Sequence, residues 1–287
     1  MQFASAGWVV ALRSQKYQGM DKSHFDKLSV TQGDPFEKTR TALAGTDFSD
    51  VRYTPRTGST NEDALRLLGQ PENQGATVVT DFQNAGSGRK GRKWIAPPGS
   101  ALLFTTILPT SLDASALWAV PFWCGLAISN ALALHGVGTT LQWPNDVLLE
   151  GRKVAGILCV SRGAGARVWA ACGVGINLTR TDDEPYRGID PPPAFLDDVA
   201  LTDRAELLAT ILGQFARSLG DLHDAQRIAR QWQDAARLPG ATYRLLVDGE
   251  ARPFEAVAQR LGYGGALVVL HNGSEREISF ADARVLR

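Results

Sequence analysis

Cysteine is scarce in this sequence, and its pattern excludes two kinds of site. The three cysteines, Cys124, Cys159 and Cys172, are odd in number, widely spaced and set among apolar residues. Neither a disulfide framework nor a zinc site has this pattern. Long hydrophobic runs are also missing, since no apolar run approaches the ~20 residues that span a bilayer. The apolar patch from Trp8 to Leu12 follows no positive residue, so it is a poor signal peptide.

The sequence also lacks a surplus of charge of either sign. Lys and Arg number 30, and Asp and Glu number 30, so the formal net charge is zero. A dedicated nucleic-acid binder normally shows a basic surplus, which disfavours that class. The composition, with 44% hydrophobic and 21% charged residues over 287 positions, is that of an ordinary globular protein. We therefore expect a soluble, cytoplasmic α/β protein with no membrane role.

Helix and strand signals alternate between residues 34 and 238. Asp34, followed by proline, is placed as the N-cap of a helix that ends near residue 45. Ser59 with Glu62, and Asp203 with Glu206, have the spacing of capping boxes that open two more helices. A buried helix is predicted at 116–134, and strands are predicted at 76–82, 102–108, 141–143, 154–160 and 168–174.

The two ends of the chain have a different texture. Residues 1–33 show no clear period and are interpreted as a loosely ordered extension, and residues 180–200 are interpreted as a loop. Short strands and turns fill residues 239–287, with a hairpin turn signal at 271–273. A module of this size is too small to be very stable alone, so we expect it to dock on the main domain. We thus predict three parts: 1–33, 34–238 and 239–287.

A basic, glycine-rich loop covers residues 83–94, Q-N-A-G-S-G-R-K-G-R-K-W. Its interleaved glycines and cations offer backbone N–H groups and positive charge to an anion, although a solvated basic loop would look the same. The loop contains G-x-G-x-x-G, the dinucleotide fingerprint. That interpretation is rejected, because the fingerprint requires a helix to open there, and Pro97-Pro98-Gly99 follows instead.

Three other segments carry candidate site residues, and each also has a purely structural interpretation. Lys153 follows W-P-N-D and starts a buried strand, either as a charge anchored in a pocket or as an edge-strand lysine. The S-T-N of residues 59–61 is explained equally well as a helix cap. Gly173 and Gly175 permit close approach to a ligand or mark a bulge.

Taken together and in this order, these segments resemble the biotin protein ligase family. The matching motifs are S-T-N, G-x-G-R-x-G-R-x-W, W-P-N-D, K-x-x-G-I-L and G-x-G-I-N, and the resemblance covers about residues 50–238. It implies an α+β fold, namely a class II synthetase-like catalytic domain with a mixed or antiparallel sheet and helices. Residues 239–287 match the family's small SH3-like β-barrel domain more loosely.

The resemblance implies a two-step ligase. Biotin and ATP, with Mg²⁺, give biotinyl-5′-AMP and pyrophosphate, and biotin then passes to one lysine of a biotin carboxyl carrier domain. By the same resemblance Lys153 and Arg89 are catalytic, and no residue is assigned as a metal ligand. The implied biotin site comprises Ser59, Thr60, Asn61, Gln83, Ser87, Gly88, Arg89 and Lys153. The implied nucleotide or adenylate site comprises Arg89, Arg92, Trp94, Asn145, Asp146, Lys153 and Asn177.

The residue types suit this chemistry. Neutral donors and acceptors match a ureido ring, and cations stabilise the negative charge that develops in phosphoryl transfer. Two departures from the family stand out: Ser87 where many members have Arg, and Gln142 where Lys is frequent. We expect altered nucleotide or acceptor handling from them, and residues 180–200 match no adenylate-covering segment.

The sequence leaves two other functions to consider besides the biotin ligase. A lipoate ligase or octanoyl transferase is the alternative enzyme, but a transferase needs a nucleophilic cysteine, and Cys159 and Cys172 lie in apolar strands. A biotin-binding sensor with decayed activity is the non-enzyme alternative. The 58 residues before Ser59 show no recognition-helix pattern, so we expect a monofunctional enzyme with no DNA role, as a monomer or a homodimer.

Overall fold

The computed structural model describes residues 9–10, 34–181, 184–189, 191–200 and 203–286. Most of the predicted N-terminal extension, residues 1–33, lies outside this part of the chain. Its described portion is the two-residue strand β1 (Val9–Val10), which pairs in parallel with β8.

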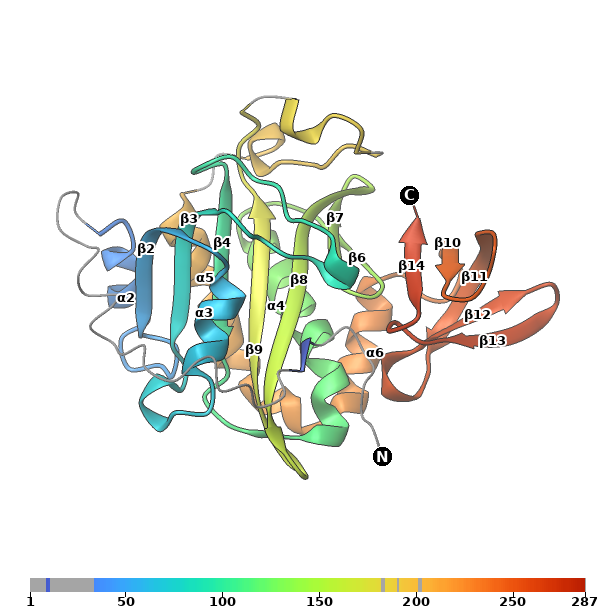
Figure 1. The fold of residues 1–287 in the computed structure, drawn as a ribbon, viewed down its shortest axis with the longest axis horizontal. Coiled ribbons are helices and arrows are strands. Elements are labelled where there is room, and N and C mark those ends of the chain that lie inside the picture. Colours follow the sequence, from blue (N-terminus) through green and yellow to red (C-terminus); the bar gives the residue numbers. More distant parts are fainter. Residues whose placement is uncertain (1–8, 11–33, 182–183, 190, 201–202, 287) are drawn as a thin grey trace.

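A nine-stranded mixed sheet forms the centre of the fold (Figure 1). Its main path runs β2-β3-β4-β9-β8-β7-β6, with only the β2–β3 pair parallel along that path. The longest strands, β8 and β9, pair without a register shift from Ala155 to Ala164. The bounds along the chain are β2 (Val51–Thr57), β3 (Thr77–Gln83), β4 (Ala101–Ile107), β5 (Leu112–Asp113, beside β9), β6 (Thr140–Gln142), β7 (Asp146–Leu149), β8 (Arg152–Ala164) and β9 (Arg167–Asn177).

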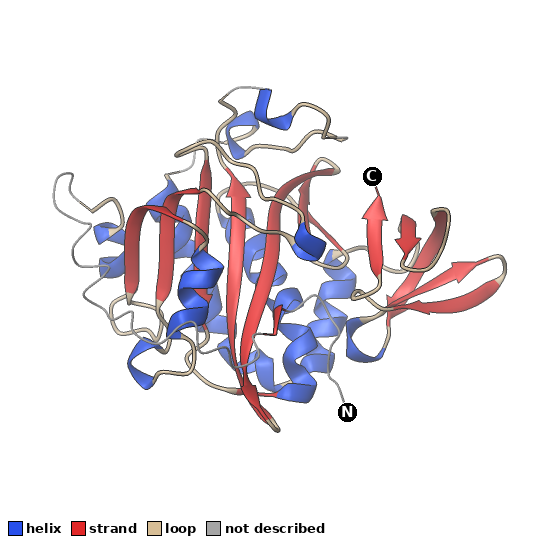
Figure 2. Cartoon of the chain, in the orientation of Figure 1, coloured by secondary structure: helices blue, strands red, loops and turns tan. Residues whose placement is uncertain are grey.

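Helices cover both faces of this sheet (Figure 2). On one face lies α3 (Thr60–Leu67), whose buried side chains form a small cluster with Val78 and Ala171. The larger core lies on the other face, under the remaining helices. These helices are α2 (Glu37–Ala42), α4 (Val120–Leu134), α5 (Arg204–Ser218) and α6 (Ala225–Ala235).

One helical stretch corrects the statement that no apolar run reaches membrane length. Ala114–Leu134 has the length and apolarity of a membrane span, and it includes the predicted buried helix with Pro121 in the first turn of α4. It packs against β8, α5 and α6, and most of it is buried. Those contacts are the ones expected of a core helix.

The start signals of the helices have different outcomes. Asp203 caps α5 as predicted, because its Oδ1 accepts hydrogen bonds from Ala205 N and Glu206 N. The capping box predicted for Ser59 is wrong, since the Ser59 side chain makes no cap hydrogen bond. The helix after Asp34 begins at Glu37, two residues later than predicted.

A second, antiparallel sheet forms the C-terminal part of the chain, in the order β13-β12-β11-β10-β14. The predicted hairpin turn is confirmed, because Asn272 and Gly273 have φ of 51° and 78° and join β12 to β13. Phe280 packs edge-on against Phe122 and Trp143, so the second sheet docks on the main domain as expected. The strands are β10 (Thr242–Val247), β11 (Phe254–Leu261), β12 (Leu267–His271), β13 (Ser274–Ile278) and β14 (Ala283–Leu286).

Candidate active site

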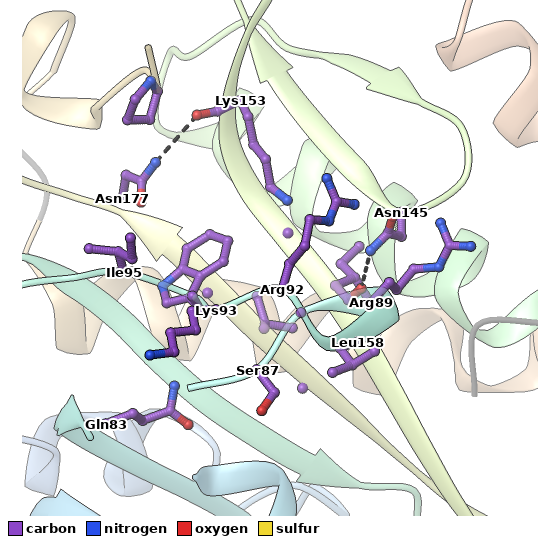
Figure 3. Close-up of a pocket in the computed structure, with 18 of the residues that line it drawn as sticks. Gln83, Ser87, Arg89, Arg92, Lys93, Ile95, Asn145, Lys153, Leu158 and Asn177 are labelled. Carbon is purple, nitrogen blue, oxygen red and sulfur yellow. Dashed lines mark hydrogen bonds between the residues drawn. The ribbon is translucent and has the colours of Figure 1, made fainter. Parts of the chain in front are cut away.

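A cavity of about 420 Å³ lies over β8 and β9, between the start of α3 and the basic glycine-rich loop (Figure 3). Residues from all five sequence motifs line it. Of the predicted site residues, those that line the cavity are Ser59, Thr60, Asn61, Gln83, Ser87, Gly88, Arg89, Arg92, Trp94, Asn145, Lys153 and Asn177. Asp146 is the exception, and it contacts the site through Lys153. The structure therefore gathers in one place residues that are up to 118 positions apart in the sequence (Ser59 to Asn177).

Glycines in β8 and β9 make room for the Trp94 indole, which lies on the strands. Gly156 and Gly175 face each other in the strand register. A Cβ at Gly175 would lie 2.5 Å from Trp94 Cε2, and one at Gly156 would lie 2.9 Å from Trp94 Cζ3. Gly173 makes similar room for Asn61. The strands pair here without a register shift, so the bulge interpretation is wrong, and the groups that approach the glycines in this structure are side chains of the protein itself.

We expect Gly175→Ala to lower the free energy of unfolding by about 1–3 kcal/mol, because the new methyl group overlaps Trp94. Chemical denaturation measures this loss. Gly138→Ala is the matched control, since no atom lies within 4 Å of a Cβ at that position. Trp94→Ala should relieve the overlap, so the double variant should be more stable than the two single losses predict. Equal losses of stability for Gly175→Ala and Gly138→Ala would show that the Trp94 indole does not lie against β8 and β9 at Gly175.

An uncharged hydrogen-bond network forms the end of the cavity next to α3. Gln83 Oε1 accepts from Thr60 N at 2.7 Å and from Thr60 Oγ1 at 3.1 Å, so Gln83 satisfies the helix start that Ser59 leaves open. Thr105 Oγ1 lies 2.9 Å from Thr60 Oγ1 and 2.8 Å from Asn61 Oδ1. These groups are neutral donors and acceptors held in fixed positions, which suits a neutral polar ligand.

Lys153 lies at the charged side of the cavity. Its Nζ is 2.6 Å from Asp146 Oδ1 and 5.3 Å from the centre of the Trp94 ring. Its strand β8 pairs with β7 and β9, so the edge-strand interpretation of Lys153 is wrong. Asn177 Nδ2 donates to Lys153 O at 3.3 Å (Figure 3) and to Ala194 O at 3.1 Å. Asn177 thereby ties the segment after residue 190 to β8.

Arg89 lines the cavity, as expected, and is 93% buried. Its guanidinium donates to Phe280 O in the C-terminal sheet, because a buried cation requires hydrogen-bond acceptors. Burial lowers the pKa of Arg89 to about 10, with Asp146 opposing this effect and Arg92 adding to it, so Arg89 remains a cation at neutral pH. Within the described residues, Arg89 Nε and Trp94 Nε1 are buried donors without an acceptor.

The glycine-rich loop has no helix that could bind a pyrophosphate. A single short turn, Arg89–Gly91, occupies its centre, and Lys90 there has φ 54°. Gly88 N donates to Arg92 O at 2.6 Å, and Trp94 N donates to Gly86 O at 3.0 Å, which folds the loop back on itself. Rejection of the dinucleotide fingerprint is therefore confirmed.

Sequence reasoning missed Thr105, which supports the cavity residues Thr60 and Asn61, and four residues that line the cavity itself. Thr105 lies in the apolar run L-L-F-T-T-I-L of residues 102–108, where a threonine pair was the available signal. Tyr186, Ile189, Pro191 and Pro193 come from the unassigned segment 180–200 and line the cavity. The aromatic ring of Tyr186 among acidic residues and prolines was a signal for this segment.

The cysteines lie on the other face of the sheet, in the main core. Cys159 Sγ and Cys172 Sγ are 3.9 Å apart, and Cys124 is buried in the same cluster. Burial raises the pKa of the Cys124 and Cys159 thiols. None of the three lines the cavity described above, so this arrangement provides no thiolate nucleophile there.

Comparisons with known proteins agree on one family. Residues 53–177 match the model of the biotin/lipoate A/B protein ligase family. The chain is 40% identical over 172 residues to the biotin–[acetyl-CoA-carboxylase] ligase of Paracoccus denitrificans, covering 56% of this chain and 70% of that protein. It is 30% identical over 209 residues to the ligase of the same name from Mycobacterium tuberculosis, covering 70% and 72% of the two chains.

The fold is also similar to that of a solved biotin protein ligase structure. The biotin protein ligase of Aquifex aeolicus, in complex with biotin and ATP, matches with a TM-score of 0.65 at 22% identity. The match covers 84% of this chain and 100% of that one.

Proposed function

The chain belongs to the biotin/lipoate A/B protein ligase family, and from this premise we propose that it is an ATP-dependent biotin protein ligase. The observation that supports this function best is the meeting of all five motifs around one cavity, with neutral polar groups near α3 and cations near β8. Curated relatives named biotin–[acetyl-CoA-carboxylase] ligase favour this activity over lipoate attachment.

Biotin is proposed to bind in the cavity, over β8 and β9. The ureido ring would bind the network of Thr60, Asn61 and Gln83, and Trp94 would provide an apolar wall beside the ring and chain. Ser59, Ser87 and Gly88 complete the proposed biotin site. The carboxylate would then lie near Lys153 Nζ, which attracts it by charge.

The first step joins biotin to the nucleotide. A carboxylate oxygen of biotin attacks the α-phosphorus of ATP, a new O–P bond forms, and the bond to the pyrophosphate leaving group breaks. Lys153, Arg89 and Arg92 stabilise the negative charge that develops on the phosphorus oxygens. The buried donors Arg89 Nε and Trp94 Nε1, which have no acceptor among the described residues, are available to ligand oxygens.

The other residues of the proposed nucleotide site hold neighbouring parts of the site in place. Asn145 Nδ2 donates to Ile157 O at 2.6 Å and so ties the turn before β7 to β8, and Asp146 holds Lys153 in place. Asn177 anchors the segment that carries Pro193 at the cavity.

Mg²⁺ is proposed to arrive with ATP. When bound, it neutralises charge on the phosphates, which in such sites supply most of its ligands together with water. The described residues contain no group of three His, Cys, Asp or Glu side chains that could hold a metal alone.

In the second step the amine of an acceptor lysine attacks the carbonyl carbon of the adenylate. The new amide bond forms, AMP leaves, and the amine proton passes to solvent. The acceptor is a biotin-carrying protein, and we propose a biotin carboxyl carrier domain of a carboxylase. We further propose a cytoplasmic enzyme that acts as a monomer or a homodimer.

Incubation with biotin, MgATP and a carrier domain tests this function. We expect the intact mass of the carrier to rise by one biotinyl group, only when ATP is present. Lipoic acid and octanoic acid in place of biotin should give no comparable gain, and this arm separates the ligase from the lipoate-type alternative. Biotin binding without any mass gain would instead support a sensor without ligase activity.

A further inference from the structure

The glycine-rich loop is tied to the C-terminal sheet by a second contact besides that of Arg89. Lys90 Nζ lies 2.7 Å from Asp248 Oδ2. The Lys90 side chain is only 17% exposed, whereas that of Asp248 is 60% exposed. Asp248 follows β10, and its backbone N donates to Asp282 O at 2.7 Å, so the carboxylate is presented from an anchored turn.

Three features of the loop make its ordered shape costly in free energy. Lys90 has φ 54° and ψ 38°, in the left-handed region that side-chain-bearing residues seldom adopt. Gly88 and Gly91 on either side increase the freedom that the loop loses when it is ordered. Four cations among residues 89–93 also repel one another. An acidic partner for Lys90 offsets each of these effects.

The carboxylate is well suited to that task. The hydrogen bond from Lys90 lowers the pKa of Asp248, so Asp248 is anionic at neutral pH. Among the described residues, Asp248 is the only acid in ion-pair contact with Lys90. Lys90 directly follows Arg89, so the position of one residue limits that of the other.

We propose that Asp248 is a positioning residue for the ligase reaction: through Lys90 it holds the glycine-rich loop over the cavity and slows the escape of the adenylate. This inference rests on the proposed function, which supplies the adenylate. Asp248 itself lies outside the cavity lining, so it acts through the loop.

The test compares Asp248→Asn with a matched control in the full-length protein. Glu275→Gln is the control, because it removes the acid of another exposed ion pair, with Arg260, in the same sheet. Two rates are measured: trypsin cleavage between residues 89 and 93 without ligand, and dissociation of biotinyl-5′-AMP. We expect Asp248→Asn to raise both by about two- to fivefold, the size typical of an exposed ion pair, and Glu275→Gln to change neither.

Further measurements distinguish a positioning role for Asp248 from a merely structural one. Asp248→Glu should restore both rates, since it keeps the charge, and added salt should shrink the gap between wild type and Asp248→Asn. Exchanging the charges, with Lys90→Asp and Asp248→Lys together, should restore adenylate retention even if Asp248→Asn is less stable. Wild-type values of both rates in Asp248→Asn would overturn the proposal.

The two proposals can fail separately. The trypsin measurement requires no ligase activity. If Asp248→Asn accelerates cleavage but the wild type forms no adenylate, the loop contact stands and the proposed function fails. If the wild type forms adenylate and Asp248→Asn releases it no faster, the ligase function stands and the positioning role is wrong.

Discussion

Lys153→Ala is expected to reduce biotin-dependent pyrophosphate exchange by about two to three orders of magnitude. Lys153 is the cation whose Nζ lies on the β8 side of the cavity, where the proposed biotin carboxylate and α-phosphate meet. Its loss removes a charge-assisted hydrogen bond at a position where the Lys153 side chain is only 25% exposed, which costs about 2–4 kcal/mol of transition-state stabilisation. The variant also leaves the Asp146 carboxylate, only 13% exposed, without the ammonium group beside it.

A second substitution, at Asp146, tests whether Lys153 acts by its charge. If Lys153 acts by its charge, adding Asp146→Asn to Lys153→Ala should recover part of the biotin affinity, because an anion no longer faces the biotin carboxylate. The exchange rate should stay low in the double variant. Lys38→Ala, on the exposed side of α2, is the matched control and should leave exchange unchanged. Exchange at the wild-type rate in Lys153→Ala would remove Lys153 from the catalytic role.

Much of this fold follows from local signals in the sequence. Apolar runs predict β3, β4, β8 and β9 because a strand that is buried on both faces must be apolar throughout. The Asn272-Gly273 turn and the Asp203 cap are likewise confirmed, since each depends on residues within a few positions. The Ser59 capping box is a wrong prediction, because a distant side chain, Gln83, replaces the local one.

The candidate site, like the fold, could be predicted only in part from the sequence. Its motif segments could be found from the sequence because each is a short run of unusual residues. Contacts between distant segments could not, such as Arg89 with Phe280, 191 positions apart, or Thr105 with Asn61. No local pattern encodes which backbone carbonyl a buried guanidinium reaches. That information resides in the docking of the second sheet, which only the three-dimensional structure shows.

Arg89→Gly should release the adenylate about ten- to a hundredfold faster than wild type. Arg89 is buried between the cavity and the C-terminal sheet, with one N–H group on Phe280 O and a buried Nε that has no acceptor among the described residues. In the proposed complex that guanidinium faces the adenylate phosphate, and one charge-assisted contact contributes roughly 1.5–3 kcal/mol. Glycine removes this contact and also loosens the loop. Adenylate affinity should therefore fall more than biotin affinity, because the lost partner is the phosphate.

Escaped adenylate is detectable because a mixed anhydride acylates any accessible lysine. Serum albumin incubated with Arg89→Gly, biotin and MgATP should become biotinylated on a streptavidin blot, whereas wild type should leave it almost unlabelled. Arg260→Ala, which breaks an exposed ion pair in the C-terminal sheet, is the control and should resemble wild type. Arg89→Lys should be intermediate, since it keeps the charge but loses the planar fork of donors. If Arg89→Gly forms adenylate and labels the carrier yet leaves albumin as clean as wild type does, Arg89 does not retain the intermediate, and the role proposed for the loop is wrong.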